Sequence, residues 1–268
     1  WHKPIRNIWY KRIVNYIYNA FLSGWHILPV FKLFFIIKKL DINIVHTNSI
    51  MSIDPSIAAK IAGIPHIWHI REAIGNHQDA IVRFPLQRFP GIFSFFMDKL
   101  SDRVIVNSNF TLSHAQKSFP HRKLEVIYNS LPDDWFVQKE YKSDKSEFVV
   151  GTIANVTAQM KNHKLVIEVA AILKHRYPEI NVTFQIYGNL PADNSPYYLG
   201  LKKKIDHLYV GGIVKFMGRI PVESIYSEID ILFHPFGKEG FGRIYIEAMG
   251  KGIPVVALEG GGADELIE

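Results

Sequence analysis

Short apolar runs alternate along the chain with longer segments of helical periodicity. The runs predict strands, and the segments between them predict helices. Strands that alternate with helices usually pair in parallel and are covered on both faces, so the pattern favours an α/β fold with parallel sheets. The predicted strands are residues 42–46, 66–70, 103–107, 124–128, 148–153, 182–187, 214–216, 231–234 and 254–257.

Capping residues mark three of the predicted helices. Asp54, followed by a proline, opens an alanine-rich segment that stops at Gly63, which is the usual order of N-cap, first-turn proline and terminal glycine. Ser108 is suited to cap a helix that reaches Phe119. The longest amphipathic segment, residues 161–177, predicts a third helix.

The periodic pattern is lost between Ser130 and Glu147, where polar residues replace the apolar runs. Such a stretch is typical of a connection between domains. We therefore expect an N-terminal domain over residues 1–140 and a second domain over residues 141–268, which agrees with about 100–200 residues per domain.

The composition is that of a folded protein, and its basic charge is unevenly distributed. Hydrophobic residues make up 48% and charged residues 21%, which excludes a disordered or fibrous chain. The net charge is +6, and residues 1–40 contain seven basic, ten aromatic and no acidic residues. This segment predicts contact with an anionic membrane surface. The alternative is that its aromatic residues pack into the N-terminal domain and its charges face water. We expect no nucleic-acid partner, because no motif that reads DNA or RNA is visible.

The absence of cysteine excludes disulfides and thiolate metal sites and favours a reducing compartment, so we expect a cytoplasmic protein. The longest uncharged stretch, from Ile13 to Phe31, is interrupted by polar residues and is a poor membrane span and a poor signal peptide. Because the chain begins at Trp1, we expect its true N-terminus to be missing.

The candidate chemistry lies after the predicted strand 231–234. The sequence lacks the phosphate-binding loop, the HExxH zinc motif and the GxSxG motif. Glu239 lies in a glycine-containing loop, and a helix is expected to begin near Gly240 or Phe241. Seven residues are nearly two helical turns, so Glu247 would share a face with the helix start, about 10 Å along the axis.

This arrangement is suited to a nucleotide. Glycines let a ligand approach the backbone, and the free N–H groups of a helix N-terminus favour phosphate. The carboxylate of Glu247 can accept hydrogen bonds from both hydroxyls of a ribose. The alternative is an ordinary capped helix on which Glu239 and Glu247 face water.

The segment also resembles the E-x7-E motif of glycosyltransferase family 4, retaining enzymes of GT-B fold that use nucleotide sugars. The resemblance covers nearly the whole chain from about residue 40. It implies two Rossmann-like domains of GT-B type, both incomplete in this chain. The matching segments are Ile44–Ser49, Val106–Ser108, Ile127–Asn129, Val149–Thr152, Ile186–Gly188, Phe216–Pro221, Ile231–Pro235, Glu239–Gly242, Glu247–Met249, Gly252–Ala257 and Gly261–Glu265.

The resemblance also implies roles for single residues. Glu239 would contact the donor sugar and Glu247 would hold the ribose. Lys161 would neutralise the charge that develops on the leaving diphosphate. A departure from the family is Asn155, which stands where the family usually has an arginine. The remaining donor-binding residues that the resemblance implies are Asn155, Gly188, Arg219, Gly240, Phe241 and Gly242.

His69 matches a position at which these enzymes often place a histidine facing the donor sugar. It lies at the end of a predicted strand, where open α/β sheets bind ligands. A histidine satisfied by its neighbours is the alternative. Arg71 and Glu72 fit an acceptor contact and a local ion pair equally well. No metal site is expected, because His66, His69 and His77 lack the spacing of metal ligands.

As a whole, the resemblance implies a glycosyltransferase of polysaccharide biosynthesis. It would move a sugar from a donor such as a UDP- or GDP-sugar to a glycan or lipid-linked acceptor, with retention at the anomeric carbon and without a further cofactor. Attachment to the inner face of the membrane is consistent with residues 1–40. Two alternatives stay open: a GT-B-type epimerase of sugar nucleotides, and a non-catalytic homologue that only binds them.

Overall fold

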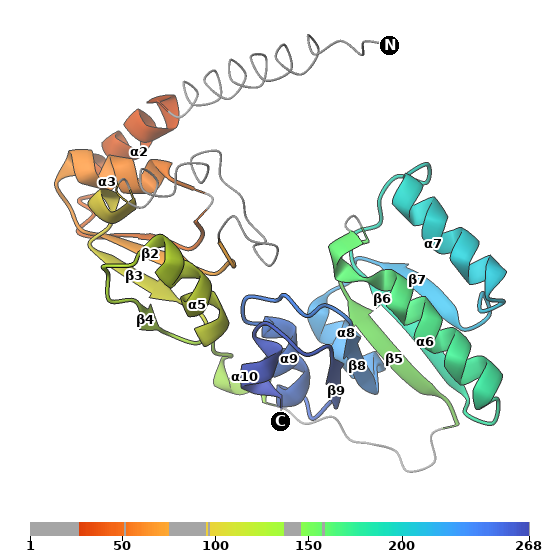
Figure 1. The fold of residues 1–268 in the computed structure, drawn as a ribbon. Coiled ribbons are helices and arrows are strands. Elements are labelled where there is room, and N and C mark those ends of the chain that lie inside the picture. The colour runs from red at the N-terminus through yellow and green to blue at the C-terminus, as the bar shows by residue number, and fades with distance from the viewer. Residues whose placement is uncertain are drawn as a thin grey trace, which may run out of the picture. The chain divides into compact units, whose positions relative to one another are not determined.

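The computed structural model describes residues 27–50, 52–74, 95, 97–136, 146–156 and 159–267. The chain forms two compact units (Figure 1). The first comprises Trp1–Asn107 and Leu112–Ile127, and the second comprises Ser108–Thr111 and Tyr128–Glu268. Each unit contains its own parallel sheet, which confirms the expected α/β class.

The sheet of the first unit has the order β1-β2-β3-β4, and all its neighbouring strands are parallel. The apolar side chains of β2 and β3 alternate with more exposed ones and pack in a core around Trp68 and Phe119. This arrangement agrees with the period of two in the sequence. The strands are β1 (Val45–Thr47), β2 (His66–Ile70), β3 (Arg103–Val106) and β4 (Glu125–Val126).

Helices α2 (Ile27–Lys39) and α3 (Asp54–Ala62) pack against each other through a small apolar cluster that includes Val30 and Ile37. Gly63 ends α3 with a φ of 73°, as expected for a C-terminal glycine. Asp54 is the first helical residue and not the cap that we expected, because the carbonyl of Ile53 already receives the Ser56 hydroxyl and backbone N–H.

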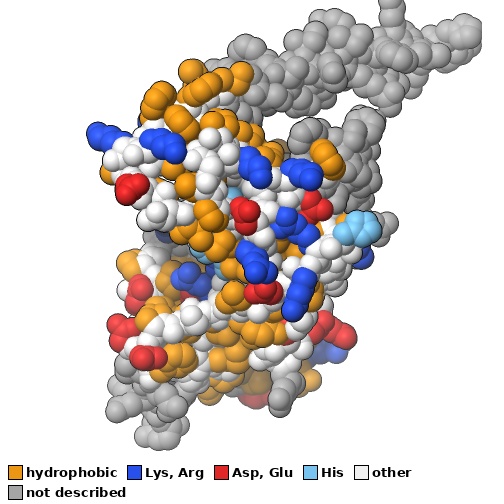
Figure 2. All heavy atoms as spheres, turned by 90° about the vertical axis from the view of Figure 1, so that its left-hand side faces the viewer, with side chains coloured by type: hydrophobic (Ala, Val, Ile, Leu, Met, Phe, Trp, Pro, Cys, Tyr) orange, Lys and Arg blue, Asp and Glu red, His pale blue; other side chains and the backbone are white. Residues whose placement is uncertain are grey.

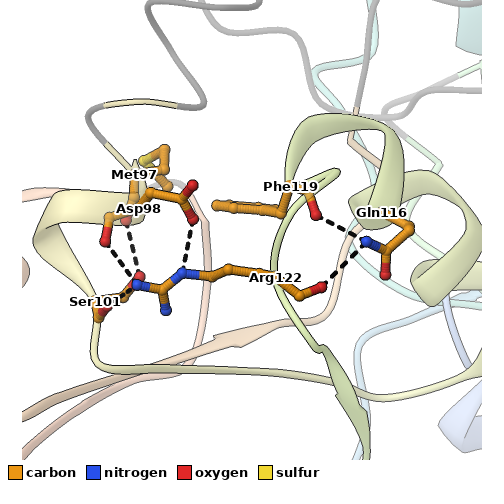
Figure 3. A network of polar contacts seen from close by, with 6 residues as sticks. All are labelled: Met97, Asp98, Ser101, Gln116, Phe119 and Arg122. Carbon is orange, nitrogen blue, oxygen red and sulfur yellow. Dashed lines mark hydrogen bonds and ion pairs between the residues drawn. The ribbon is translucent and has the colours of Figure 1, made fainter.

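Helix α5 (Asn109–Ser118) has the cap that the sequence predicts, since the hydroxyl oxygen of Ser108 accepts the N–H of Thr111 at 2.9 Å. The turn after α5 is fastened by Arg122 (Figure 3). Its guanidinium forms an ion pair with Asp98 at 2.7 Å and donates to the carbonyl of Ser101 at 2.5 Å. This clamp joins two segments that are distant in the sequence.

The second unit has a sheet of order β7-β6-β5-β8-β9, again parallel throughout. One apolar core lies under α6 and α7, and a second lies under α8, α9 and α10, so helices cover both faces (Figure 1). The strands are β5 (Phe148–Ile153), β6 (Val182–Tyr187), β7 (Val214–Gly218), β8 (Ile231–His234) and β9 (Val255–Ala257). The helices are α6 (His163–Arg176), α7 (Pro196–His207), α8 (Val222–Glu228), α9 (Arg243–Gly250) and α10 (Ala263–Leu266).

Several boundaries differ from the sequence expectations. Strand β1 begins at Val45 and not at residue 42, and β4 spans only Glu125–Val126 of the predicted residues 124–128. Helix α6 begins at His163 and not at residue 161, because Asn162 has a φ of 53° and separates α6 from a 3₁₀ turn at Gln159–Lys161. The units divide earlier than residues 140 and 141, because Trp135 packs against the core of the second unit. Residues 137–145 of the polar connection lie outside the described part.

No helix within the described ranges is long and apolar enough to cross a membrane.

Candidate functional site

The carboxyl ends of β5 and β8 mark the place where the strand order of the second unit reverses. From β5 the chain proceeds to β6 and β7 on one side, and then returns to β8 on the other side of β5. Open α/β sheets bind their ligands at such a switch point. Lys161 follows β5 and Glu239 follows β8, and their side chains form an ion pair. The structure thus brings together two residues that the sequence singled out separately.

Glu239 lies in a partly buried and strongly polar environment. Its Oε1 atom also lies 3.2 Å from Nε2 of His234, a side chain with 1% exposure. Burial by itself would raise the pKa of Glu239, but the hydrogen bond from His234 and the positive charge of Lys161 outweigh it and lower the pKa to about 2. Glu239 is therefore an ionised hydrogen-bond acceptor at neutral pH.

Lys161 is held from two sides. Its ammonium lies 4.2 Å from the centre of the Phe236 ring, in addition to its ion pair with Glu239. The 3₁₀ turn and the left-handed Asn162 place this lysine before helix α6 and not within it. The lysine is one-quarter exposed, so its charge is accessible to a ligand.

Two glycine-containing loops pack directly on each other beneath Glu239. A Cβ atom on Gly261 would lie 2.5 Å from the carbonyl oxygen of Glu239, and one on Gly262 would lie 2.2 Å from that of Phe241. The N–H of Gly262 donates to the Glu239 carbonyl at 2.8 Å. This amide is occupied by the protein, so the glycines fix the backbone of the Glu239 loop.

Helix α9 begins at Arg243, not near Gly240 or Phe241 as expected. Gly242 has a φ of 82°, and a Cβ there would lie 2.2 Å from the Tyr245 ring, so residues 240–242 form a tight turn before the helix. Glu247 is consequently about one turn, or ~6 Å, from the first helical residue and not two turns. The two carboxylates still lie on one continuous segment.

Glu247 is nearly buried, with 4% exposure. Its Oε1 accepts a hydrogen bond from Nε of Arg243 at 2.6 Å, and its Oε2 accepts one from the hydroxyl of Tyr226 at 3.0 Å. The expected alternative of a glutamate that merely faces water is therefore wrong for this residue. Glu247 borders a cavity of about 450 Å³, whose other walls include Trp135 and Lys251.

Asn155 and Gly188 lie side by side where β5 and β6 end. The side-chain oxygen of Asn155 accepts the N–H of Asn189 at 2.9 Å. Gly188 has a φ of 143°, and a Cβ there would lie 2.4 Å from the carbonyl oxygen of Ala154. Arg219 is exposed directly after β7, at the same edge of the sheet. These three residues are at the edge that carries Lys161.

His69 belongs to the first unit. Its ring stacks on that of His46 at 5.7 Å between centroids. Burial lowers the pKa of His69, and the positive charge of Arg71 lowers it further, so the imidazole is neutral at pH 7. Its buried Nε2 has no hydrogen-bond partner among the described residues. A fully satisfied core histidine is thus not what the structure shows.

Glu72 is an element of local structure in the same unit. Its carboxylate accepts the Ser49 hydroxyl at 2.5 Å and the backbone N–H groups of Ile50 and Arg71. The described residues contain no group of three or more His, Asp or Glu side chains placed to bind a metal ion, and His77 lies outside them.

The sequence did not reveal the neighbours that hold the two glutamates. His234 was visible as the polar end of a buried strand, but its partner was not. Trp135 and Tyr226 stand far from the motif in the sequence and reach Glu247 only through the fold. An aromatic residue directly after a Pro-Asp-Asp turn was the one available signal for Trp135.

Both halves of the chain match families of known proteins. Residues 133–268 match the family described as glycosyl transferases group 1, and residues 3–135 match the family described as glycosyltransferase family 4. Among curated proteins, the GtfA subunit of a UDP-N-acetylglucosamine–peptide N-acetylglucosaminyltransferase from Streptococcus parasanguinis is 23% identical over 75% of this chain and 38% of its own length. A D-inositol 3-phosphate glycosyltransferase from Corynebacterium urealyticum is 29% identical over 42% of this chain and 27% of its own length.

A solved structure has the same fold. The HepE protein of Anabaena, crystallised with UDP, superimposes with a TM-score of 0.72 and 23% identity over 89% of this chain and 65% of that protein. The chain therefore spans between about a quarter and two thirds of the length of these three proteins. Since the two family matches together cover almost every residue, the chain belongs to the glycosyl transferases group 1 family and has the GT-B fold that its sequence predicted.

Proposed function

We propose that the protein transfers a sugar from a nucleoside diphosphate sugar to a glycan or lipid-linked acceptor, with retention at the anomeric carbon. The observation that carries the proposal is the pair of Lys161 and Glu239 at the switch point of the second unit. The UDP bound to HepE and the UDP-sugar in the name of GtfA support a donor of this class. Retention rests on the resemblance alone.

In the proposed reaction, the acceptor hydroxyl forms a bond to the anomeric carbon while the bond from that carbon to the diphosphate breaks. Negative charge accumulates on the leaving diphosphate, and an oxygen of that diphosphate takes up the proton of the acceptor hydroxyl. Lys161 stabilises that charge after exchanging its contact with Glu239 for the phosphate. Glu239 accepts hydrogen bonds from the donor sugar, and Glu247 accepts them from the ribose.

Asn155 leaves the donor site with one cation fewer than the family usually has. Its side-chain oxygen is occupied by the backbone of Asn189. The main electrostatic stabilisation is therefore assigned to Lys161, and no divalent cation or further cofactor is included in the proposal. We assign the sugar-facing role in the first unit to His69, whose neutral ring has an unpartnered buried nitrogen among the described residues.

The proposed partner surface is an anionic membrane at the cytoplasmic face. Residues 1–26 of the predicted segment lie outside the described part, but α2 is described. Its exposed apolar side chains include Leu28 at 78% and Phe35 at 65%. Figure 2 shows hydrophobic side chains at the height of α2 with Lys and Arg side chains near them. Apolar and basic groups together suit the headgroup layer.

A donor panel tests the reaction. The full-length protein is incubated with UDP- and GDP-sugars and candidate acceptors, and NMR follows product formation and anomeric configuration. Lys161→Met should reduce turnover about 100-fold or more, the range seen when one stabilising donor is removed. The control is Lys164→Met, because Lys164 is an exposed lysine of α6 that has no part in the proposed site.

The outcomes separate the candidate functions. A product with retained configuration supports the proposal, and an inverted product contradicts its stereochemistry. A protein that binds the donor but forms no product with any acceptor is a non-catalytic homologue. A changed nucleotide sugar without an acceptor indicates an epimerase.

A further inference from the structure

The carboxylate of Glu247 is positioned by neighbours that lie outside the motif. One neighbour, Tyr226, comes from α8, and another, Trp135, comes from the segment that enters the second unit. Both are separated from Glu247 in the sequence and meet it in the apolar core beneath α9.

Tyr226 holds one carboxylate oxygen. The tyrosine is 1% exposed, and its hydroxyl donates to Oε2 of Glu247 at 3.0 Å, with the carbonyl oxygen of Ile244 as a more distant second acceptor at 3.3 Å. Burial raises the pKa of Tyr226, and the adjacent charge of Glu247 raises it further, so the phenol keeps its proton and remains the donor. A hydrogen bond to a charged acceptor in a buried site is stronger than a neutral one.

Trp135 fixes the backbone of the same residue. Its indole N–H donates to the carbonyl oxygen of Glu247 at 2.9 Å. The indole also meets the ring of Tyr226 edge-on, with 5.8 Å between centroids and 85° between planes. Glu247 is thus held at its main chain by Trp135 and at its side chain by Tyr226.

The remaining carboxylate oxygen, Oε1, is held by the Nε of Arg243 at 2.6 Å. Each oxygen of an ionised carboxylate can accept two hydrogen bonds, so each keeps one acceptor position after these contacts. Two free positions on neighbouring oxygens match two neighbouring hydroxyls. A glutamate that is already ordered also loses less side-chain entropy when a ligand binds.

We propose that Tyr226, supported by Trp135, is a positioning residue that orients the Glu247 carboxylate for the vicinal hydroxyls of the donor ribose. The inference rests on the proposed function, because it assumes a nucleotide at Glu247. It assigns to a tyrosine of the apolar core a role in ligand affinity.

The test compares two buried tyrosines of one core. Tyr187 is 0% exposed and belongs to the same cluster as Tyr226, but its hydroxyl donates to Glu228 at 3.3 Å and to Gln185. Tyr226→Phe and Tyr187→Phe therefore remove the same group from similar surroundings. Calorimetric titration of the full-length protein with UDP and GDP should show about threefold to tenfold weaker binding for Tyr226→Phe, because a carboxylate that is no longer held loses more side-chain entropy when the nucleotide binds. Tyr187→Phe should bind as the wild type does.

Two further readouts distinguish positioning from general loosening. With the active donor, Tyr226→Phe should raise KM while kcat changes little. In a Glu247→Ala background, Tyr226→Phe should cause no additional loss of affinity, because the group that it orients is absent. Trp135→Phe, which frees the Glu247 backbone, provides a second route if Tyr226→Phe folds poorly.

The failures are distinguishable. Equal UDP affinity of the wild type and Tyr226→Phe, or an equal loss with and without Glu247, overturns this inference alone. A wild type that binds neither UDP nor GDP overturns the proposed function, and this inference with it.

Discussion

At the scale of single residues, the ionised state of Glu239 gives protein stability a defined dependence on pH. Its pKa of about 2 in the folded protein lies below its ordinary value of 4.5. Its contribution to the free energy of unfolding is therefore fully present above about pH 4.5 and is lost as the pH falls toward about 2. By the size of the shift, the contribution is of the order of 3 kcal/mol.

The corresponding experiment compares urea unfolding of the wild type and Glu239→Gln at several pH values. The stability difference between the two proteins should shrink as the pH falls through this acidic range. A difference that is the same at neutral and acidic pH would show that the carboxylate charge is not what stabilises the loop.

Glu247 should contribute to nucleotide affinity rather than to turnover alone. Glu247→Ala removes the proposed acceptor of the ribose hydroxyls, and each hydrogen bond to a charged group is worth about 1.5–3 kcal/mol. Calorimetry with UDP and GDP should show affinity reduced at least about tenfold. The exposed Glu179 provides the control, Glu179→Ala, which should bind like the wild type. Unchanged affinity in Glu247→Ala would reject the ribose assignment.

The sequence identified residues of the site but not the contacts between them. Glu239 and Lys161 are distant in the sequence. Their ion pair depends on the adjacency of β5 and β8, which no local pattern encodes. Tyr226 has the periodicity of an ordinary core residue, and only its packing on α9 gives its hydroxyl a partner. Local sequence patterns predict which residues are buried. They do not predict which side chains meet across the sheet, because that depends on the order of the strands.

At the scale of elements, four strands have their predicted bounds, whereas β1 and β4 are shorter than predicted. β2, β5, β6 and β8 have the predicted bounds because each is a buried apolar run. Helices α6 and α9 begin later than expected because Asn162 and Gly242 adopt left-handed φ values. Such residues interrupt a helix locally without changing the apolar period that predicted it.

The exposed face of α2 should bind anionic vesicles. Lys32 and Lys39 lie on this helix with Leu28, Phe31 and Phe35, and at about 1 kcal/mol per basic residue the two lysines supply roughly 2 kcal/mol. The fraction of protein that sediments with anionic vesicles should decrease at high salt. It should also decrease in a variant with serine at the three apolar positions. The control is Ile172→Ser, since Ile172 is 49% exposed on α6. Salt-independent binding, equal for neutral vesicles, would reject electrostatic docking.

The Arg122 clamp should stabilise the first unit. Arg122→Met breaks an ion pair and two hydrogen bonds of a side chain with 23% exposure, so we expect a loss of about 1–3 kcal/mol. Arg103→Met is the matched control, because the Arg103 ion pair is 3.7 Å long and the arginine is 73% exposed. It should cost less than about 0.5 kcal/mol. Urea unfolding measures both changes, and equal losses would argue against the clamp.

At the scale of the whole molecule, the rate of sugar transfer should not depend on divalent cations. The proposal assigns the stabilisation of the diphosphate to the ammonium of Lys161, which lies at the switch point beside Glu239. A chelator should therefore leave the initial rate of the full-length protein largely unchanged. A strict requirement for Mg²⁺ or Mn²⁺ would contradict this assignment of charge.

The α/β architecture of the two units was predicted correctly from the sequence, but the position of the division between them was not. Alternating strands and helices indicated two parallel α/β units, and the motif order identified the family. The division was placed too late because the polar composition of the connection conceals Trp135, whose packing attaches the preceding residues to the second unit. The packing of this one aromatic side chain decides to which unit the segment belongs, although the residues around it are polar.

The environment of Trp135 should make its fluorescence sensitive to changes near Glu247. It is the last tryptophan in the sequence, and its indole N–H is bonded to the backbone of Glu247 while the ammonium of Lys251 lies 4.7 Å from its ring centre. Indole emission responds to hydrogen bonding and to nearby charge. If the proposed nucleotide binds beside Glu247, the intrinsic fluorescence of Trp135 should change on addition of UDP or GDP, without any attached dye.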